Sequence, residues 1–186
     1  MNTVIGIVGA PASGKGTIAA YCKERYGAVA LRFSDTLFPV LERLGVEPTR
    51  DNLIKLSEIL RATFGEDVLA RAIASRAAAS DAPLVVVDGV RRDADVSGLG
   101  TLPGFHLVAV AARPELRYER SKRRREKPEE AGLAYDDFLA LEGRSTEVSA
   151  RELEKKAEVV FDNDGSIEDL HRLLDVWLAS IGMTKR

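Results

Sequence analysis

The fold of this chain is decided by the stretch TVIGIVGAPASGKGT, which runs from Thr3 to Thr17. Its opening run, TVIGIV, is short and mostly apolar, as is typical of a strand buried on both faces of a parallel sheet. The glycine-rich GAPASG follows directly, and a helical pattern then extends from Lys15 to about Tyr26. A strand, a glycine-rich loop and a helix in this order predict a phosphate-binding loop.

The residue types in this loop suit the phosphate chain of a nucleotide. Glycines let the backbone turn its N–H groups toward phosphate oxygens, and the helix N-terminus adds partial positive charge. Lys15 can reach the β- and γ-phosphates, and Thr17 can ligate Mg²⁺. The usual pattern has the hydroxyl directly after the lysine, whereas Gly16 stands there in this sequence. We expect the donor nucleotide to contact Gly9, Ala10, Pro11, Ala12, Ser13, Gly14, Lys15, Gly16 and Thr17.

Composition limits the class of protein. A length of 186 residues suits a single domain, 1–186, with a sizeable core. The formal net charge of -2 gives no global attraction to nucleic acid or to an anionic membrane, so neither is expected as a partner. The sequence shows no run of about 20 apolar residues and no signal peptide, which favours a cytoplasmic location. We expect a monomer or a homodimer.

Four more short apolar runs alternate with helical patterns, at 28–33, 84–87, 106–111 and 159–161. This alternation predicts an α/β fold with right-handed crossovers, in which helices flank a five-stranded parallel sheet in three layers. Two segments depart from simple alternation. Residues 34–80 read as three helices in one crossover, and residues 120–156 are charged and helical. In an α/β kinase these are the places for an acceptor-binding insert and a lid.

The run LVVVDGVRR, Leu84 to Arg92, puts an acidic residue at the carboxyl end of a buried strand. In open α/β sheets that edge faces the ligand crevice. Asp88 there can hold Mg²⁺ through water or orient an acceptor, and Arg91 and Arg92 are well placed for a phosphate. The alternative is an aspartate that caps a turn, followed by two solvated arginines.

A basic run, RPELRYERSKRRREK, carries three arginines at helical spacing: Arg117, Arg120 and Arg124. Such a face can clamp a triphosphate and stabilise charge during transfer. A solvated basic face and a nucleic-acid patch are the alternatives. The second lacks aromatic residues for base stacking, because Tyr118 stands alone in this run.

Two candidates on the acceptor side come from the predicted insert. Asp35 follows the second strand and can act as a base toward a hydroxyl acceptor, or simply cap the helix beside it. Arg61 can bind an acceptor phosphate or lie in solvent. After the last strand, Asn163 begins an Asn-Asp-Gly turn whose backbone can read a base edge, although the same residues favour a turn and a helix cap.

The loop GAPASGKGT resembles that of adenylate kinase and other nucleoside monophosphate kinases, with Ala12 in place of a usual glycine. DGVRR is similar to the DGFPR segment of adenylate kinase, whose arginine contacts the acceptor phosphate; Asp88, Gly89 and Arg92 match. Arg120 and Arg124 have the spacing of an arginine pair in that family. The stretch after them would be the lid, and Arg144 is a candidate for reaching in from it. The order of motifs resembles an archaeal adenylate-kinase-related P-loop family, itself similar to dephospho-CoA kinase.

The resemblance implies ATP and Mg²⁺ as cofactors and a nucleotide-like small molecule as acceptor. We therefore expect an ATP-dependent nucleotide kinase with a nucleoside monophosphate-like acceptor held by Arg91, Arg92 or Arg61. A second hypothesis is a kinase that phosphorylates a hydroxyl group, as dephospho-CoA kinase does, with Asp35 as base. A third is a nucleotide-gated ATPase or assembly factor, because a P-loop fold does not by itself settle function.

Overall fold

The computed structural model of the chain describes residues 2–123, 134–140 and 151–186. Within these residues, parallel strands form a five-stranded sheet, whose members are β1 (Thr3–Val8), β2 (Val29–Arg32), β3 (Leu84–Asp88), β4 (Phe105–Ala111) and β5 (Val159–Asp162). The order across the sheet is β2-β3-β1-β4-β5, which puts β1 at its centre. The α/β architecture predicted from the sequence is therefore confirmed.

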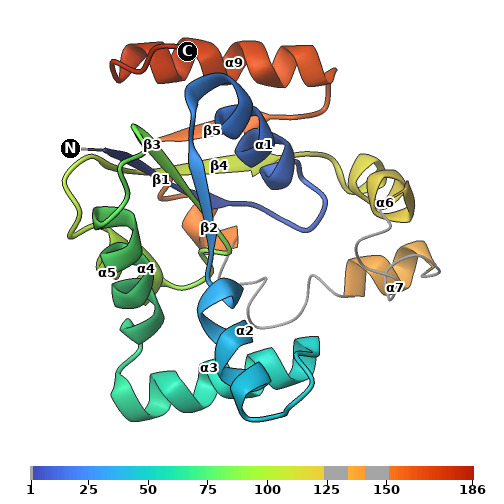
Figure 1. The fold of residues 1–186 in the computed structure, drawn as a ribbon. Coiled ribbons are helices and arrows are strands. Elements are labelled where there is room, and N and C mark those ends of the chain that lie inside the picture. The colour runs from blue at the N-terminus through green and yellow to red at the C-terminus, as the bar shows by residue number, and fades with distance from the viewer. Residues whose placement is uncertain (1, 124–133, 141–150) are drawn as a thin grey trace.

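Helices cover both faces of this sheet (Figure 1). On one face lie α1 (Lys15–Tyr26) and α9 (Ile167–Ser180), and on the other lie α4 (Val68–Ala78) and α5 (Asp93–Leu99). Successive side chains of a strand point to opposite faces, so each face has a core of its own. In β1, Ile5 and Ile7 pack with α1 and α9, whereas Val4 and Val8 join the cluster that contains α4. None of the helices in the described part of the chain is long and apolar enough to cross a membrane.

The helix after the phosphate loop is tied to α9 through Asp175. Tyr21, Tyr26 and Lys185 donate hydrogen bonds to this carboxylate at 2.9, 2.7 and 2.6 Å. Desolvation raises the pKa of Asp175, but the hydrogen bonds from Lys185, Tyr26 and Tyr21 outweigh it and lower the pKa overall. On the same helix, burial raises the pKa of the Cys22 thiol to about 12, as suits a packed residue rather than a reactive one. These contacts fix α1, and with it the loop that precedes α1.

Three helices connect β2 to β3, as the sequence predicts: α2 (Ser34–Arg43), α3 (Arg50–Phe64) and α4. Thr49 caps α3 by accepting a hydrogen bond from the backbone N–H of Asn52 at 3.3 Å. Leu69 and Ile73 of α4 are buried against the sheet. Helices α2 and α3 extend beyond the sheet (Figure 1), so they can border a ligand placed at its edge.

After β4 the structure describes α6 (Pro114–Arg123), which ends within the segment predicted as a lid, and α7 (Tyr135–Ala140), which lies inside that segment. Tyr118 of α6 makes an edge contact with Tyr135 and a tilted contact with Phe138 of α7, at ring-centroid distances of 5.2 and 5.7 Å. The hydroxyl of Tyr135 also donates to Glu115 at 3.2 Å. Aromatic packing therefore holds α7 against α6.

The sequence patterns above do not predict α5. It has only seven residues, DADVSGL, and a glycine near its end. The glycine is a packing requirement, because a Cβ added at Gly98 would lie 2.6 Å from the Cβ of Ala70 on α4. The short helix owes its stability to this close approach rather than to helix propensity.

Candidate functional site

The candidate residues gather at one edge of the sheet. Because the strands are parallel, their carboxyl ends meet there. The candidates that follow the five strands in order are the phosphate loop, Asp35, the Asp88–Arg92 segment, Arg120 and Asn163. In the strand register Asp88 pairs with Ile7 of β1 and with Arg32 of β2, so it lies beside the strand that leads into the phosphate loop.

The phosphate loop has the backbone conformation that its glycines permit. Gly9 and Gly14 have φ values of 150° and 118°, and Ala12 has φ of 60°. The left-handed conformation at Ala12 costs about 1–2 kcal/mol for a residue with a Cβ, which explains why a glycine suits this position. The Nζ of Lys15 donates to the carbonyl oxygens of Gly9 and Ala10 at 2.6 and 3.0 Å. The ammonium group is thus folded over the loop.

Asn163 holds the loop from the far side of the sheet edge. Its side chain is buried, and its Nδ2 donates to the carbonyl oxygen of Ser13 at 2.7 Å. Its backbone N–H donates to Ala111 at 2.8 Å, and its carbonyl oxygen accepts from Arg120 at 2.8 Å. Asn163 therefore positions the phosphate loop, and both of its own backbone polar groups already have protein partners.

The contact between Asn163 and the loop makes Gly14 hard to replace. A Cβ on Gly14 would lie 2.2 Å from the Nδ2 of Asn163, and the backbone there has a positive φ. We expect Gly14→Ala to lower the free energy of unfolding by about 1–3 kcal/mol, measured by urea denaturation. Gly16→Ala is the matched control, because a Cβ there meets no atom within 4 Å. Equal stability of the two variants would contradict the positioning role of Asn163.

The arginines of α6 differ in their surroundings. Arg117 is buried, and its Nε donates to the carbonyl oxygen of Ala112 at 2.9 Å, so at this position the helix does not present a solvated face. In Arg120 one terminal nitrogen binds Asn163, while Nη1 is buried without a hydrogen-bond partner among the described residues. A buried guanidinium nitrogen without an acceptor favours an anion at this point. Arg124 and Arg144 lie outside the described residues.

Asp88 also has an unused polar atom. Its Oδ1 is buried and accepts no hydrogen bond within the described part of the chain. Its Oδ2 lies 4.0 Å from the Nε of Arg32. A buried carboxylate oxygen without a donor suits a hydrated cation, and Thr17 supplies a hydroxyl in the first turn of α1. Asp88 and Thr17 therefore offer oxygen atoms of the kind that Mg²⁺ prefers.

The acceptor-side candidates differ in the partners that they have within the protein. The carboxylate of Asp35 accepts from the backbone N–H of Arg32 at 3.0 Å, so it reaches back to the strand instead of capping a helical N–H. Arg61 is 5% exposed and pairs with Asp95 at 2.7 Å, which excludes the alternative that it lies in solvent. Arg92 pairs with Glu66 at 2.9 Å.

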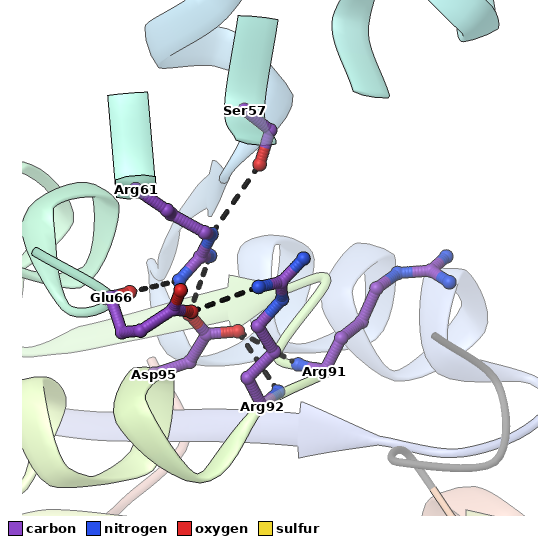
Figure 2. Close-up of polar contacts among 6 residues, drawn as sticks. All are labelled: Ser57, Arg61, Glu66, Arg91, Arg92 and Asp95. Atoms are coloured by element: carbon purple, nitrogen blue, oxygen red, sulfur yellow. Dashed lines mark hydrogen bonds and ion pairs between the residues drawn. The ribbon is translucent and has the colours of Figure 1, made fainter. Parts of the chain in front are cut away.

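The two arginines after β3 take different directions. The side chain of Arg91 extends away from the cluster around Asp95, whereas that of Arg92 turns toward Glu66 (Figure 2). Gly89, which precedes them, has φ of 92° and permits the turn out of the strand. The segment therefore presents two guanidinium groups in different surroundings.

Sequence reasoning missed two residues that organise this region, Asp95 and Glu66. Asp95 belongs to α5, the helix that was not predicted. A usable signal was present in DADVSGL. Asp93 and Asp95 precede the apolar Val96, and acidic residues are favoured in the first turn of a helix. No sequence signal marks Glu66, because its role depends on the loop between α3 and α4 meeting the loop after β3.

Known proteins resemble the chain over most of its length. A family model described as an AAA domain matches residues 8–132. A UPF0200 protein from Methanoregula boonei is 32% identical over 89% of this chain and 90% of its own length. TT1252 from Thermus thermophilus is 27% identical, with a TM-score of 0.64, over 97% of this chain and 98% of that chain. Shikimate kinase from Bacteroides thetaiotaomicron is 16% identical, with a TM-score of 0.58, over 94% of this chain and 98% of that chain, which shows the fold alone.

Proposed function

Because the chain belongs to the UPF0200 family and to the AAA-domain P-loop proteins, and has a P-loop kinase fold, we propose that it is an ATP-dependent nucleotide kinase. It would transfer the γ-phosphoryl group of ATP·Mg²⁺ to a nucleoside monophosphate-like acceptor. The fold implies nucleotide binding. The observation that carries the proposal is the meeting, at one sheet edge, of the phosphate loop, Asp88 and the arginines that follow β3.

On the donor side, the loop amides and Lys15 hold the triphosphate. Lys15 now binds carbonyl oxygens of its own loop, and these bonds would be exchanged for phosphate oxygens. Thr17 and Asp88 would hold Mg²⁺, which neutralises charge on the β- and γ-phosphates. The unpartnered Nη1 of Arg120 supports a role in stabilising charge on the transferring group. Arg124 and Arg144 stay predictions for the same role from the lid.

On the acceptor side, Arg92 and Arg91 would bind the phosphate of the monophosphate, with Gly89 allowing the close approach of the backbone. The pair between Arg92 and Glu66 is partly exposed, since the side chains are 32% and 60% accessible. An exposed pair of this kind is worth about 0–1 kcal/mol, so a phosphate can displace the carboxylate at little cost. The single kinase domain with insert and lid, the cytoplasmic location and the oligomeric state stay predictions.

An acceptor screen tests the proposal. ATP and Mg²⁺ are supplied with each common nucleoside monophosphate, each deoxynucleotide and dephospho-CoA, and ADP release is followed. We expect one monophosphate to raise ADP release well above the rate without acceptor. ATP hydrolysis that no acceptor changes would instead support a nucleotide-gated ATPase and would contradict the kinase assignment.

A hydroxyl acceptor is the second candidate, and the position of Asp35 favours it. Asp35 lies at the edge of the sheet after β2, and only its Oδ2 has a partner within the described residues. An essential general base contributes roughly 10²–10⁴-fold to the rate, whereas a phosphate acceptor needs no base.

Substitution of Asp35 separates these two candidates. For a monophosphate acceptor we expect Asp35→Asn to change kcat by less than about threefold, because no general base is removed. Asp51→Asn is the matched control, since Asp51 is an exposed residue in the first turn of the next helix. A loss confined to Asp35→Asn and approaching the full contribution of a base would favour the hydroxyl-directed reaction.

A further inference from the structure

A buried carboxylate controls the segment that follows β3. Asp95 lies in the first turn of α5 (Figure 2) and is 1% exposed. Its Oδ2 accepts hydrogen bonds from the backbone N–H groups of Arg91 and Arg92, at 3.0 and 3.1 Å. A capping acid ordinarily binds one N–H at the start of its helix. Here one oxygen binds two consecutive amides, and this fixes the backbone from which both arginine side chains start.

The other oxygen of Asp95 connects this loop to the insert. Oδ1 accepts from Nη2 of Arg61 at 2.7 Å. Arg61 comes from α3 and is the one buried residue of that helix. Its Nε donates to Ser57 at 3.4 Å, and its Nη1 donates to the carbonyl oxygen of Glu66. Each of the three guanidinium nitrogens therefore has a protein partner, and the side chain is buried within the fold.

Glu66 completes a connection between the insert and the arginine loop. Its carbonyl oxygen accepts from Arg61, and its Oε2 accepts from Nη1 of Arg92 at 2.9 Å. Figure 2 shows these contacts converging from α3, from the loop after α3 and from the start of α5. A shift of α3 would therefore be transmitted to the arginine loop through Asp95 and through Glu66.

We infer that Asp95 and Arg61 are positioning residues for the acceptor phosphate, and that Arg61 acts through Asp95 rather than by touching the acceptor. This inference rests on the proposed function, because it assigns the Arg91–Arg92 loop to the acceptor phosphate. Arg61, which the sequence analysis gave as a candidate for binding the acceptor phosphate, is thereby reassigned to holding Asp95 in place. It also gives the insert a means of adjusting the loop when α3 moves.

Conservative variants test the inference, because full truncation of a buried ion pair leaves an uncompensated charge and risks unfolding. The variants are Asp95→Asn, Arg61→Lys and their combination. Asp93→Asn is the control, since Asp93 lies in the same helical turn but makes an exposed pair with Lys156. Each protein is saturated with the non-hydrolysable β,γ-imido analogue of ATP and titrated with AMP, GMP, CMP and UMP by calorimetry.

For Asp95→Asn we expect the dissociation constant of the preferred monophosphate to rise about 10-fold, because the loop amides lose a charged acceptor, while that of the ATP analogue stays unchanged. Hydrogen exchange of the Arg91 and Arg92 amides should become faster in the same variant. Because Arg61 acts through Asp95, Arg61→Lys should add less than about twofold in the Asp95→Asn background.

Three results would overturn the inference in different ways. If the losses of Arg61→Lys and Asp95→Asn multiply, Arg61 contacts the acceptor directly. If Asp95→Asn weakens the ATP analogue as much as the monophosphate, the pair is a general structural support. If the parent protein binds the ATP analogue but none of the four monophosphates, the assigned acceptor is wrong and the inference fails with it, whereas failure to bind the analogue removes the proposed function itself.

Discussion

Lys15→Ala is expected to weaken ATP binding by about 100-fold, equivalent to about 2.7 kcal/mol. The ammonium group lies over the phosphate loop, within 3.0 Å of the carbonyl oxygens of Gly9 and Ala10. It is therefore positioned to make charge-assisted hydrogen bonds with a phosphate chain held by the same loop. Calorimetric titration with ATP in the presence of Mg²⁺ measures the loss directly.

Lys23→Ala provides the control for this measurement. Lys23 lies on the same helix but is exposed near its end, so its removal changes the net charge equally without touching the loop. We expect its dissociation constant for ATP to match that of the parent. Identical ATP binding by the Lys15 and Lys23 variants would show that the loop is not the donor site, and the proposed function would then be wrong.

Asp88→Asn is expected to reduce turnover by roughly 10- to 100-fold, the range found when a group that supports a metal site is removed. The buried Oδ1 of Asp88 has no partner among the described residues, so a bound cation or its water is the interaction at risk. An amide of the same shape would keep the packing but lose the negative charge. Turnover is measured against Mg²⁺ concentration, and the half-saturating concentration should rise.

ATP binding in the absence of Mg²⁺ separates a metal effect from a structural one. Asp88→Asn should leave the dissociation constant for ATP without Mg²⁺ unchanged, because the loop amides and Lys15 are intact. Asp81→Asn serves as the control, since Asp81 is exposed in the turn that leads into β3. A normal Mg²⁺ dependence in Asp88→Asn would remove Asp88 from the metal site and leave it as a residue that orients the acceptor.

Much of the fold could be predicted because the signals are local. The strand at Thr3–Val8 and the helix at Lys15–Tyr26 match the structure at both ends. A buried parallel strand is an apolar run, and the loop between these elements has a recognisable glycine spacing. Two further helix starts depend on contacts of the same local kind: Pro114 lacks the backbone N–H that a first helical position leaves unpaired, and Ser166 caps α9 by accepting from the backbone N–H of Asp169.

The acceptor side was less predictable because its contacts join distant parts of the chain. Arg61 and Asp95 are 34 positions apart, and nothing near either residue shows that they meet. The α5 helix escaped the sequence patterns because its seven residues depend on packing against Ala70. Asn163 was identified as a candidate, but its contact with Ser13, 150 positions away, could not be anticipated.

By itself, the sequence determined the phosphate loop of this protein: a strand, a turn of glycines and a lysine that together suit a phosphate chain. Backbone conformation and local spacing carry that information, so it can be read within 15 consecutive residues, Thr3 to Thr17. Only the tertiary structure decided which arginines are buried within the fold, as Arg61 is, and which stay partly exposed after β3, as Arg92 does. A guanidinium group binds whichever carboxylate or phosphate lies within reach, and what lies within reach depends on how the helices of the insert pack against the sheet.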